Sequence, residues 1–388
     1  MNNDKNTLEQ FMCSFCGNNY SRPNVLLGLD NSIICENCIE LYHDIINFGQ
    51  EEEKEIPILS PITIYEELNK AVIGQDKAKK QLSVAVVNHL KRVKYHLDVE
   101  KANVLLIGPT GSGKTLIAKN LAKILNLPFA IVDATVYTEA GYVGEDVENI
   151  LLRLLQNANY DKKRAEMGIV FIDEIDKLAR KSENVSITRD VSGEGVQNSL
   201  LKIIEGNIIN IPPQGGRKHP YQEYITFDTT NVLFICAGAF DGLTKTKTMA
   251  SIGFHKKEQV VEESICDNLI KYGIIPELLG RLPNIVQMDL LTENELKEIL
   301  LLPNNGIIAQ YQKLLSVDNI DLKFDDEVIS RIANIAYNTQ GGARSLRRIL
   351  EDIMLDIMFE ETNKSENYNY LITKETIEDH LNYQKIKI

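Results

Sequence analysis

The sequence predicts an α/β protein built on a three-layer, doubly wound parallel sheet, with a C-terminal, mainly helical domain and an N-terminal four-cysteine domain. Three observations indicate this architecture. Five short apolar runs alternate with helical patterns, as in a buried parallel sheet. One of these runs leads directly into a glycine-rich phosphate loop. Four of the six cysteines fall within the first 40 residues.

Composition narrows the classes of protein to consider. The chain has 388 residues and a formal net charge of −13. This length suffices for two or three domains. A general nucleic-acid surface needs an excess of Lys and Arg, which this acidic chain lacks. No apolar run approaches the roughly 18 residues of a membrane span, and the first ten residues lack an apolar signal core. We therefore expect a cytoplasmic protein with no nucleic-acid or membrane partner.

The N-terminal cysteines follow the spacing C-x2-C-x18-C-x2-C, formed by Cys13, Cys16, Cys35 and Cys38. Each C-x2-C pair turns two thiolates to one side of a tight turn, so two pairs suit tetrahedral Zn²⁺. Two disulfides or four buried thiols remain alternatives. Because four thiolates complete the coordination shell, the expected zinc site is structural.

Composition shifts predict the domain boundaries. The acidic, proline-containing stretch "QEEEKEIPILSP" separates a zinc-binding domain at 1–48 from the rest and predicts a linker at 49–62. A large α/β ATPase domain is expected at 63–290. A small helical domain is expected at 291–388, where Thr292 and Glu295 form a capping box and two amphipathic helical patterns follow.

The phosphate loop carries the first catalytic prediction. The apolar run 104–107 predicts a strand, a helical pattern begins after Lys114, and the residues between match G-x-x-x-x-G-K-T. Lys114 is expected to reach the β- and γ-phosphates of ATP, and Thr115 to bind Mg²⁺. The expected nucleotide contacts here are Gly108, Pro109, Thr110, Gly111, Ser112, Gly113, Lys114 and Thr115.

Two carboxylates end another predicted strand, in "GIVFIDEIDKL". Ligands of open α/β sheets bind at the carboxyl ends of the strands, so Asp173 is expected to hold Mg²⁺ and Glu174 to orient or deprotonate the attacking water. A pair of solvated acids opening a helix is the alternative. The other predicted strands are 129–134, 231–238 and 284–290, and Cys236 is predicted to be a core residue.

Two arginines are candidates for stabilising the charge that develops during hydrolysis. Arg281 lies in a Gly-Arg-Leu-Pro corner before an apolar strand, and Arg344 starts a long helical pattern. From spacing alone, a solvated arginine or a surface ion pair explains each equally well.

An ordered series of motifs resembles the ClpX family of AAA+ ATP-dependent unfoldases over nearly the whole chain. Besides the cysteines, phosphate loop and acidic strand end, the series comprises "VIGQDKAK" at 72–79, "GYVGEDVE" at 141–148, "RDVSGEGVQ" at 189–197, "GGRKHP" at 215–220, "SIGF" at 251–254, "GRLP" at 280–283 and "GGARSLR" at 341–347. HslU-type unfoldases share the ATPase core but are not expected to combine a zinc domain with this I-G-F tripeptide.

The resemblance implies roles around the nucleotide. Val72 and Ile73 would contact adenine, Arg344 would touch phosphates in its own subunit, and Arg281 would reach the nucleotide of a neighbouring subunit. Sites shared in this way imply a homohexamer. One position departs from many relatives: the fourth core strand ends in Cys-Ala-Gly at 236–238, so no polar sensor residue is assigned there.

The resemblance also assigns three loops. Substrate gripping in a central pore would fall to Tyr142 and Val143, and contact with substrate ends at the pore mouth to Arg217, Lys218 and His219. The tripeptide Ile252, Gly253 and Phe254 would dock on the ClpP peptidase. From the residues alone, each loop also has a plainer interpretation: a locally packed turn for Tyr142 and Val143, a solvated loop tip for Arg217, Lys218 and His219, and local packing of Phe254.

The sequence therefore predicts an ATP-dependent unfoldase that uses ATP, Mg²⁺ and Zn²⁺, forms a homohexamer and delivers protein substrates, directly or through adaptors, to ClpP. A protein remodeller that works without a protease is the first alternative. A nucleic-acid motor is the second, and the acidic composition disfavours it.

Overall fold

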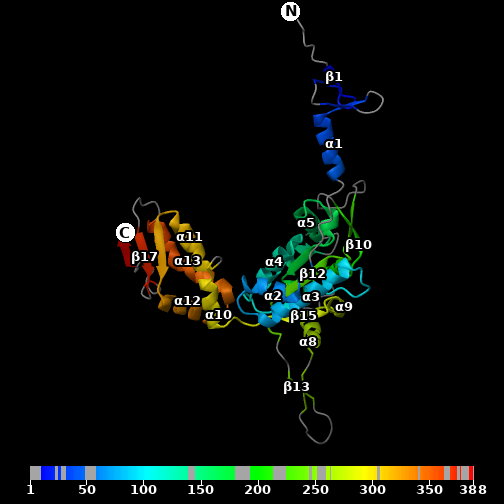
Figure 1. Cartoon of the computed structure of the whole chain (residues 1–388). Helices are drawn as coiled ribbons and strands as arrows, with labels where there is room; N and C mark the ends of the chain where they lie inside the picture. The colour runs from blue at the N-terminus through cyan, green and yellow to red at the C-terminus, as the bar shows by residue number, and fades with distance from the viewer. Residues whose placement is uncertain are drawn as a thin grey trace, which may run out of the picture. The chain divides into compact units, whose positions relative to one another are not determined.

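The computed structural model divides the chain into two compact units, Met1–Pro57 and Ile58–Ile388, shown in Figure 1. The residues that the structure describes are 10–21, 25–27, 32–48, 58–138, 145–179, 193–212, 224–243, 247–250, 259–262, 264–303, 306–339, 341–361, 368–373, 376 and 384–387.

The described residues of the N-terminal unit form two short antiparallel ladders and one helix. The ladders pair β1 with β2 and β3 with β4. The elements are β1 Gln10–Met12, β2 Asn19–Ser21, β3 Val25–Leu27, β4 Ile33–Cys35 and α1 Glu36–Phe48. Its core contains Cys13, Cys35 and Cys38, against which Tyr20 and Ile34 pack. A core made mostly of cysteines is too small to stabilise a domain by apolar burial alone.

A five-stranded parallel sheet organises the second unit. Its strand order is β15-β5-β12-β9-β6, and every neighbouring pair is parallel. The strands are β5 Val104–Ile107, β6 Phe129–Asp133, β9 Ile169–Asp173, β12 Leu233–Gly238 and β15 Asn284–Gln287. All five lie where the apolar runs predict them. Because the strands are parallel, the phosphate loop after β5 and the acids that end β9 lie at the same edge of the sheet.

Helices cover both faces of this sheet, which confirms the three-layer prediction. Leu105 and Ile107 of β5 belong to a core shared with α5 Asn149–Asn157, α7 Glu194–Ile204, α8 Ile265–Tyr272 and α9 Pro276–Gly280. The alternate side chains of β5, Val104 and Leu106, are equally buried on the opposite face. Helices that contact one another or the strands there are α2 Pro61–Asn69, α3 Asp76–Lys94 and α4 Lys114–Leu125.

A separate hydrophobic core runs from Leu291 to Ile372. Its helices are α10 Glu293–Leu301, α11 Ile307–Ser316, α12 Asp326–Asn338 and α13 Gly342–Glu361. The capping box of Thr292 and Glu295 starts α10 as predicted. A three-stranded sheet accompanies the helices, with β17 Tyr368–Ile372 between β16 Ile320–Phe324 and β18 Gln384–Lys387 (Figure 1). The prediction of a mainly helical region is confirmed, although it did not include this sheet.

Shorter elements flank several of the predicted functional loops. β7 Tyr137–Thr138 pairs in parallel with β8 Glu145–Asp146, on either side of residues 139–144. The antiparallel pairs are β10 Ile208–Ile211 with β11 Ile225–Asp228, and β13 Lys247–Ala250 with β14 Gln259–Glu262. The remaining elements are α6 Lys162–Ala165, a 3₁₀ turn at Ala134–Val136 and another at Ile175–Leu178. Within the described ranges, no helix has both the length and the apolar character needed to cross a bilayer.

Candidate functional site

The phosphate loop links the carboxyl end of β5 to the first turn of α4. Gly111 and Gly113 have φ of 78° and 99°, a left-handed conformation that favours glycine. Gly113 is the N-cap of α4, and Lys114 is its first residue. The amide groups at this helix start are available to an anion, and the helix dipole attracts negative charge. The loop therefore suits the phosphates of ATP.

Lys114 is the cation of this loop. Its Nζ donates to the carbonyl oxygens of Gly108, at 2.6 Å, and Pro109, at 3.0 Å. Burial lowers the pKa of Lys114, opposed by the negative charges of Asp173, Asp176 and Asp241, while the Arg344 charge lowers it further. The charge of Arg344 is therefore felt at Lys114.

Thr115 and Asp173 meet at the carboxyl edge of the sheet. Thr115 Oγ1 donates to Asp173 Oδ2 at 2.9 Å, and the Glu174 amide donates to Asp173 Oδ1 at 3.0 Å. A hydroxyl and a carboxylate are oxygen ligands of the kind that Mg²⁺ prefers. The first turn of α4 and the end of β9 thus supply a pair of groups that fits Mg²⁺, as the sequence predicts.

Glu174 directly follows this pair and is exposed. Its φ of 56° puts a non-glycine residue in the left-handed region, which is uncommon and costs backbone energy. The residue lies between the end of β9 and the 3₁₀ turn Ile175–Leu178. This sharp turn leaves the Glu174 carboxylate accessible to solvent beside Asp173.

Asp176 is a buried carboxylate that sequence reasoning missed. It is 4% exposed, and its Oδ1 accepts a hydrogen bond from the Ala239 amide at 3.2 Å. The Lys177 ammonium lies 3.6 Å from Oδ2. Asp176 thereby ties the turn after β9 to the end of β12, where no polar sensor was assigned. Its position two residues after Glu174 was the available signal, but the sequence did not distinguish a buried acid from a solvated one.

Val72 and Ile73 lie in the segment between α2 and α3. Val72 is buried and Ile73 is half-buried. Lys79 Nζ, itself almost fully buried, donates to the Val72 carbonyl oxygen at 3.1 Å. The backbone that would face the adenine base is therefore held by a lysine one turn into α3.

The start of α13 lies against the phosphate loop. The Ala343 amide donates to the Gly111 carbonyl oxygen at 3.2 Å. Gly342, with φ of 58°, packs directly on the Gly111 backbone. Arg344 follows on the same turn and is exposed. The structure thus brings Arg344 to the nucleotide-binding loop of its own chain.

Arg281 lies elsewhere in the large core. It follows α9 and precedes β15, whose Asn284 is in register with Val104 at the start of β5. The phosphate loop follows the other end of β5, and a four-residue strand spans about 13 Å. Arg281 Nε donates to Glu205 Oε1 at 3.1 Å, and Arg281 Nη2 lies 3.1 Å from the same oxygen as an ion pair. Within one chain, the structure does not bring Arg281 to Lys114.

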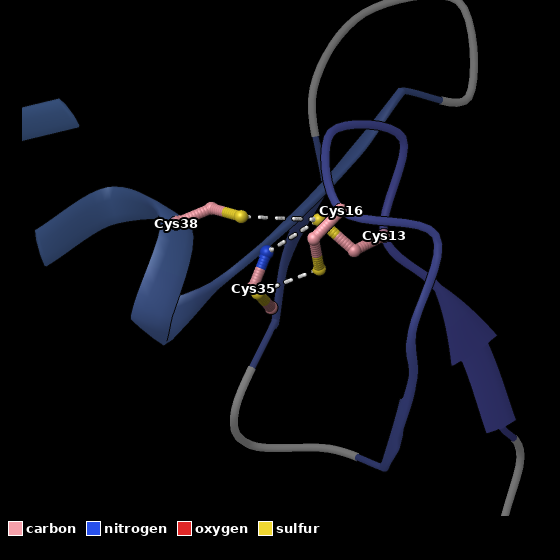
Figure 2. Close-up of side chains that lie close together, drawn as sticks. All are labelled: Cys13, Cys16, Cys35 and Cys38. Atoms are coloured by element: carbon pink, nitrogen blue, oxygen red, sulfur yellow. Dashed lines mark hydrogen bonds between the residues drawn. The ribbon is translucent and has the colours of Figure 1, made fainter. Parts of the chain in front are cut away.

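The four N-terminal cysteines form a compact thiol cluster. Their Sγ atoms all lie within 4.8 Å of one another, and Figure 2 shows them converging from a turn, a strand end and a helix start. Cys13 and Cys38 are 3.9 Å apart, and Cys16 and Cys35 are 3.7 Å apart. Disulfide sulfurs lie about 2.05 Å apart. Tetrahedral Zn–S bonds of about 2.3 Å place sulfurs about 3.8 Å apart. The geometry fits Zn²⁺ and excludes the disulfide alternative.

Backbone groups prepare these thiols as ligands. The amides of Phe15 and Cys35 donate to Cys13 Sγ. Burial acts to raise the pKa of Cys13, but hydrogen bonds from neighbouring backbone groups lower it to about 6. The two halves of the cluster are joined by a reciprocal pair, in which Ser14 N donates to the Ile33 carbonyl oxygen and Ile33 N donates to Ser14 Oγ. A thiolate at Cys13 is the form that binds metal.

The three predicted loop sites lie outside the described residues. These are the pore residues Tyr142 and Val143, the basic residues Arg217, Lys218 and His219, and the docking tripeptide Ile252, Gly253 and Phe254. Their roles stay predictions from the sequence. Cys236 is fully buried in β12, as predicted, and burial raises its pKa to about 12.

The fold and its two sites define an AAA-type P-loop ATPase joined to a four-cysteine zinc finger. Family models match in the same order: a ClpX C4-type zinc finger at residues 12–47, an AAA domain of the Cdc48 subfamily at 99–285, and the C-terminal D2-small domain of ClpB protein at 291–369. The chain is 49% identical to the ATP-dependent Clp protease ATP-binding subunit ClpX of Treponema denticola, over 97% of this chain and 96% of the relative. The chain therefore belongs to the ClpX family of ATP-dependent AAA+ unfoldases, which confirms the predicted family, ATPase activity and need for ATP, Mg²⁺ and Zn²⁺.

Proposed function

We propose that this chain forms a homohexameric ring that unfolds protein substrates with the energy of ATP, draws them through a central pore and delivers them to the ClpP peptidase. The separation of Arg281 from Lys114 within one chain carries the proposal. An arginine finger at this position reaches phosphates only across a subunit border. Repeated head-to-tail contacts of this kind close into a ring when the rotation permits.

The steps of ATP hydrolysis are divided among side chains at the start of α4 and at the end of β9. Lys114 and the loop amides bind the phosphates, Thr115 and Asp173 hold Mg²⁺, and Glu174 orients or deprotonates the attacking water. The Mg²⁺ ion, when bound, neutralises charge that develops on the phosphate oxygens.

Groups from outside the phosphate loop complete each site. Val72 and Ile73 contact the adenine base, and Arg344 contacts phosphate from the lid of the same subunit. Arg281 of one subunit stabilises the transition state bound by its neighbour, a contribution of roughly 10³- to 10⁵-fold in other P-loop enzymes. An isolated subunit is then nearly inactive.

The proposed division of labour follows the predicted boundaries. Residues 1–48 pair with their counterparts and receive substrates or adaptors, and residues 49–62 tether them to the ring. Residues 63–290 and 291–388 form the large and lid domains. Tyr142 and Val143 grip the substrate, Arg217, Lys218 and His219 meet its end, and Ile252, Gly253 and Phe254 dock on ClpP. The relative from Treponema denticola, named as a subunit of an ATP-dependent Clp protease, supports ClpP as partner. The expected site of action is the cytoplasm.

The direct test is degradation of a stable, tagged protein by the purified chain with ClpP and ATP. Glu174→Gln is the matched control, because it removes the base and retains the loop that binds ATP. We expect degradation by the unaltered chain, and at least about 100-fold slower ATP turnover by the variant, the usual contribution of a general base. Loss of substrate structure without peptide release would instead support the remodeller. Stimulation of turnover by single-stranded DNA alone would contradict the proposal.

A further inference from the structure

Arg281 forms an ion pair with Glu205, which lies against one edge of the guanidinium group. Its Nε donates to Glu205 Oε1 at 3.1 Å, and its Nη2 lies 3.1 Å from that same oxygen. This pairing occupies one edge of the planar guanidinium group. Of its five N–H bonds, the three on the far side remain available to another acceptor. The pair therefore fixes the plane of the guanidinium while leaving the end that binds phosphate unoccupied by Glu205.

The backbone on both sides of this pair is fixed by Asn103. Asn103 is 1% exposed, and its Nδ2 donates to the carbonyl oxygens of Ile204, at 3.4 Å, and Arg281, at 3.1 Å. Its Oδ1 accepts from the Phe234 amide at 3.2 Å. One buried amide thus connects the residue before Glu205, Arg281 itself and the central sheet. The spacing between the two members of the ion pair is therefore set by the core.

The end of α7 is shaped to present Glu205. Glu205 is the C-cap of α7, and Gly206 follows with φ of 99°, the left-handed conformation that commonly ends helices. A carboxylate at a helix C-terminus faces the negative end of the helix dipole, which disfavours it. Lys101 Nζ donates to the Ile204 carbonyl oxygen at 3.1 Å and offsets part of this repulsion. A carboxylate in a locally unfavourable place, paired with one arginine, indicates a role beyond helix stability.

We infer that Glu205 is a positioning residue for Arg281, which it holds extended toward the nucleotide of the neighbouring subunit, with Asn103 fixing the backbone under both. The inference rests on the proposed function, because it assigns Arg281 to a neighbour's site. Arg281 is a long side chain, 53% exposed, and without a partner it would sample many rotamers. Restraining it before the neighbouring subunit binds ATP removes that entropic cost from each turnover.

Mixed rings test this inference, because they separate the subunit that offers the finger from the subunit that hydrolyses ATP. An Arg281→Ala chain has an intact ATP site and no finger. A Glu174→Gln chain has an intact finger and no turnover. We expect the mixture to hydrolyse ATP well above either chain alone. If it does not, the proposed trans role of Arg281 is wrong, and the inference falls with it.

The role of Glu205 is then tested by placing Glu205→Ala in one or the other of the two chains of this mixture. In the Glu174→Gln chain, it should lower the rescued kcat about three- to tenfold, with KM for ATP unchanged, as expected for loss of one ordered side chain. In the Arg281→Ala chain, it should change nothing. Equal losses from both placements would indicate a merely structural role and overturn the inference. An increase in turnover would also overturn it, because it would mean that Glu205 holds Arg281 away from the neighbouring nucleotide.

Two further variants of the Glu174→Gln chain serve as controls. Glu205→Gln retains an oxygen that can accept from Arg281 Nε, so we expect it to recover at least half of the rescued turnover. Glu277→Ala removes an exposed carboxylate of α9, the helix that Arg281 follows, and should leave turnover unchanged. If Glu277→Ala has the same effect as Glu205→Ala, general charge near the finger is responsible and the ion pair is not.

Discussion

Replacing Gly342 by alanine tests how closely the lid must approach the phosphate loop. A Cβ atom on Gly342 would lie 2.7 Å from the Gly111 carbonyl oxygen, 2.8 Å from its carbonyl carbon and 3.0 Å from its Cα. Ordinary contacts between carbon atoms are about 3.5–4.0 Å. Every atom in conflict belongs to the backbone, so no side-chain rotation relieves the overlap. The start of α13 must move away by roughly 0.5–1 Å.

The free-energy cost has two parts. Gly342 has φ of 58°, where alanine costs about 1 kcal/mol more than glycine. Moving α13 also breaks the hydrogen bond from the Ala343 amide to the Gly111 carbonyl oxygen, worth about 0.5–1.5 kcal/mol. Together these terms disfavour the seated position of α13 by about 2 kcal/mol, a factor of roughly 30 in the equilibrium constant between its seated and displaced positions. Arg344, on the same turn, is displaced with the helix.

The assay is steady-state ATP turnover, with binding of a fluorescent nucleotide measured separately. We expect turnover of Gly342→Ala to fall about 30-fold, and nucleotide binding to weaken. Gly242→Ala is the matched control, because Gly242 has φ of 86° but no atom within 4 Å of its added Cβ. It should cost only the conformational penalty. If Gly342→Ala and Gly242→Ala retain the same turnover, close packing of the lid on the loop is irrelevant and the reasoning is refuted.

Two other predictions concern stability. Burial, aided by the charges of Lys101 and Arg92, lowers the pKa of His89 to about 4 in the folded protein. Because the unfolded chain takes up this proton near pH 6.5, the free energy of unfolding should fall as the pH drops below that value, by about 2 kcal/mol at pH 5. Denaturant midpoints at pH 7.5 and 5 should show this, and an equal pH dependence in His89→Met would contradict it. Cys35→Ser should lose zinc and render only the N-terminal unit sensitive to protease, whereas Cys266→Ser should retain zinc. A protease-resistant unit without zinc would disprove the second prediction.

The sheet and the two metal centres were predictable because their signals are local. β5, β9 and β12 are buried on both faces, so each is a continuous apolar run that needs no knowledge of its neighbours. The cysteine pairs and the phosphate loop likewise place their functional atoms within a few residues. Local spacing was therefore enough to predict which residues bind phosphate and metal. It was not enough to predict whether a residue acts in its own subunit or in a neighbouring one.

The missed features depend on partners distant in the sequence. β16 pairs with β17, 48 residues later in register, and its alternating buried pattern is short enough to pass for part of a helix–loop segment. Arg281 meets Glu205 across 76 positions. Asp176 is buried only because β12 ends beside it. No local pattern encodes such contacts, and long-range pairing is the part of a fold that a single sequence specifies least directly.

The two ends of β5 explain how one chain can serve two sites. Asn103, directly before β5, is bonded to the Arg281 carbonyl oxygen, and the phosphate loop begins directly after Ile107. A central strand with parallel neighbours on both sides is among the stiffest elements of a fold. On the proposed assignment of Arg281, the finger offered to one nucleotide and the loop that binds another are therefore fixed to a single rigid body. Motion driven by ATP is then expected between the large core and the lid, where the Gly342 backbone packs directly on the Gly111 backbone.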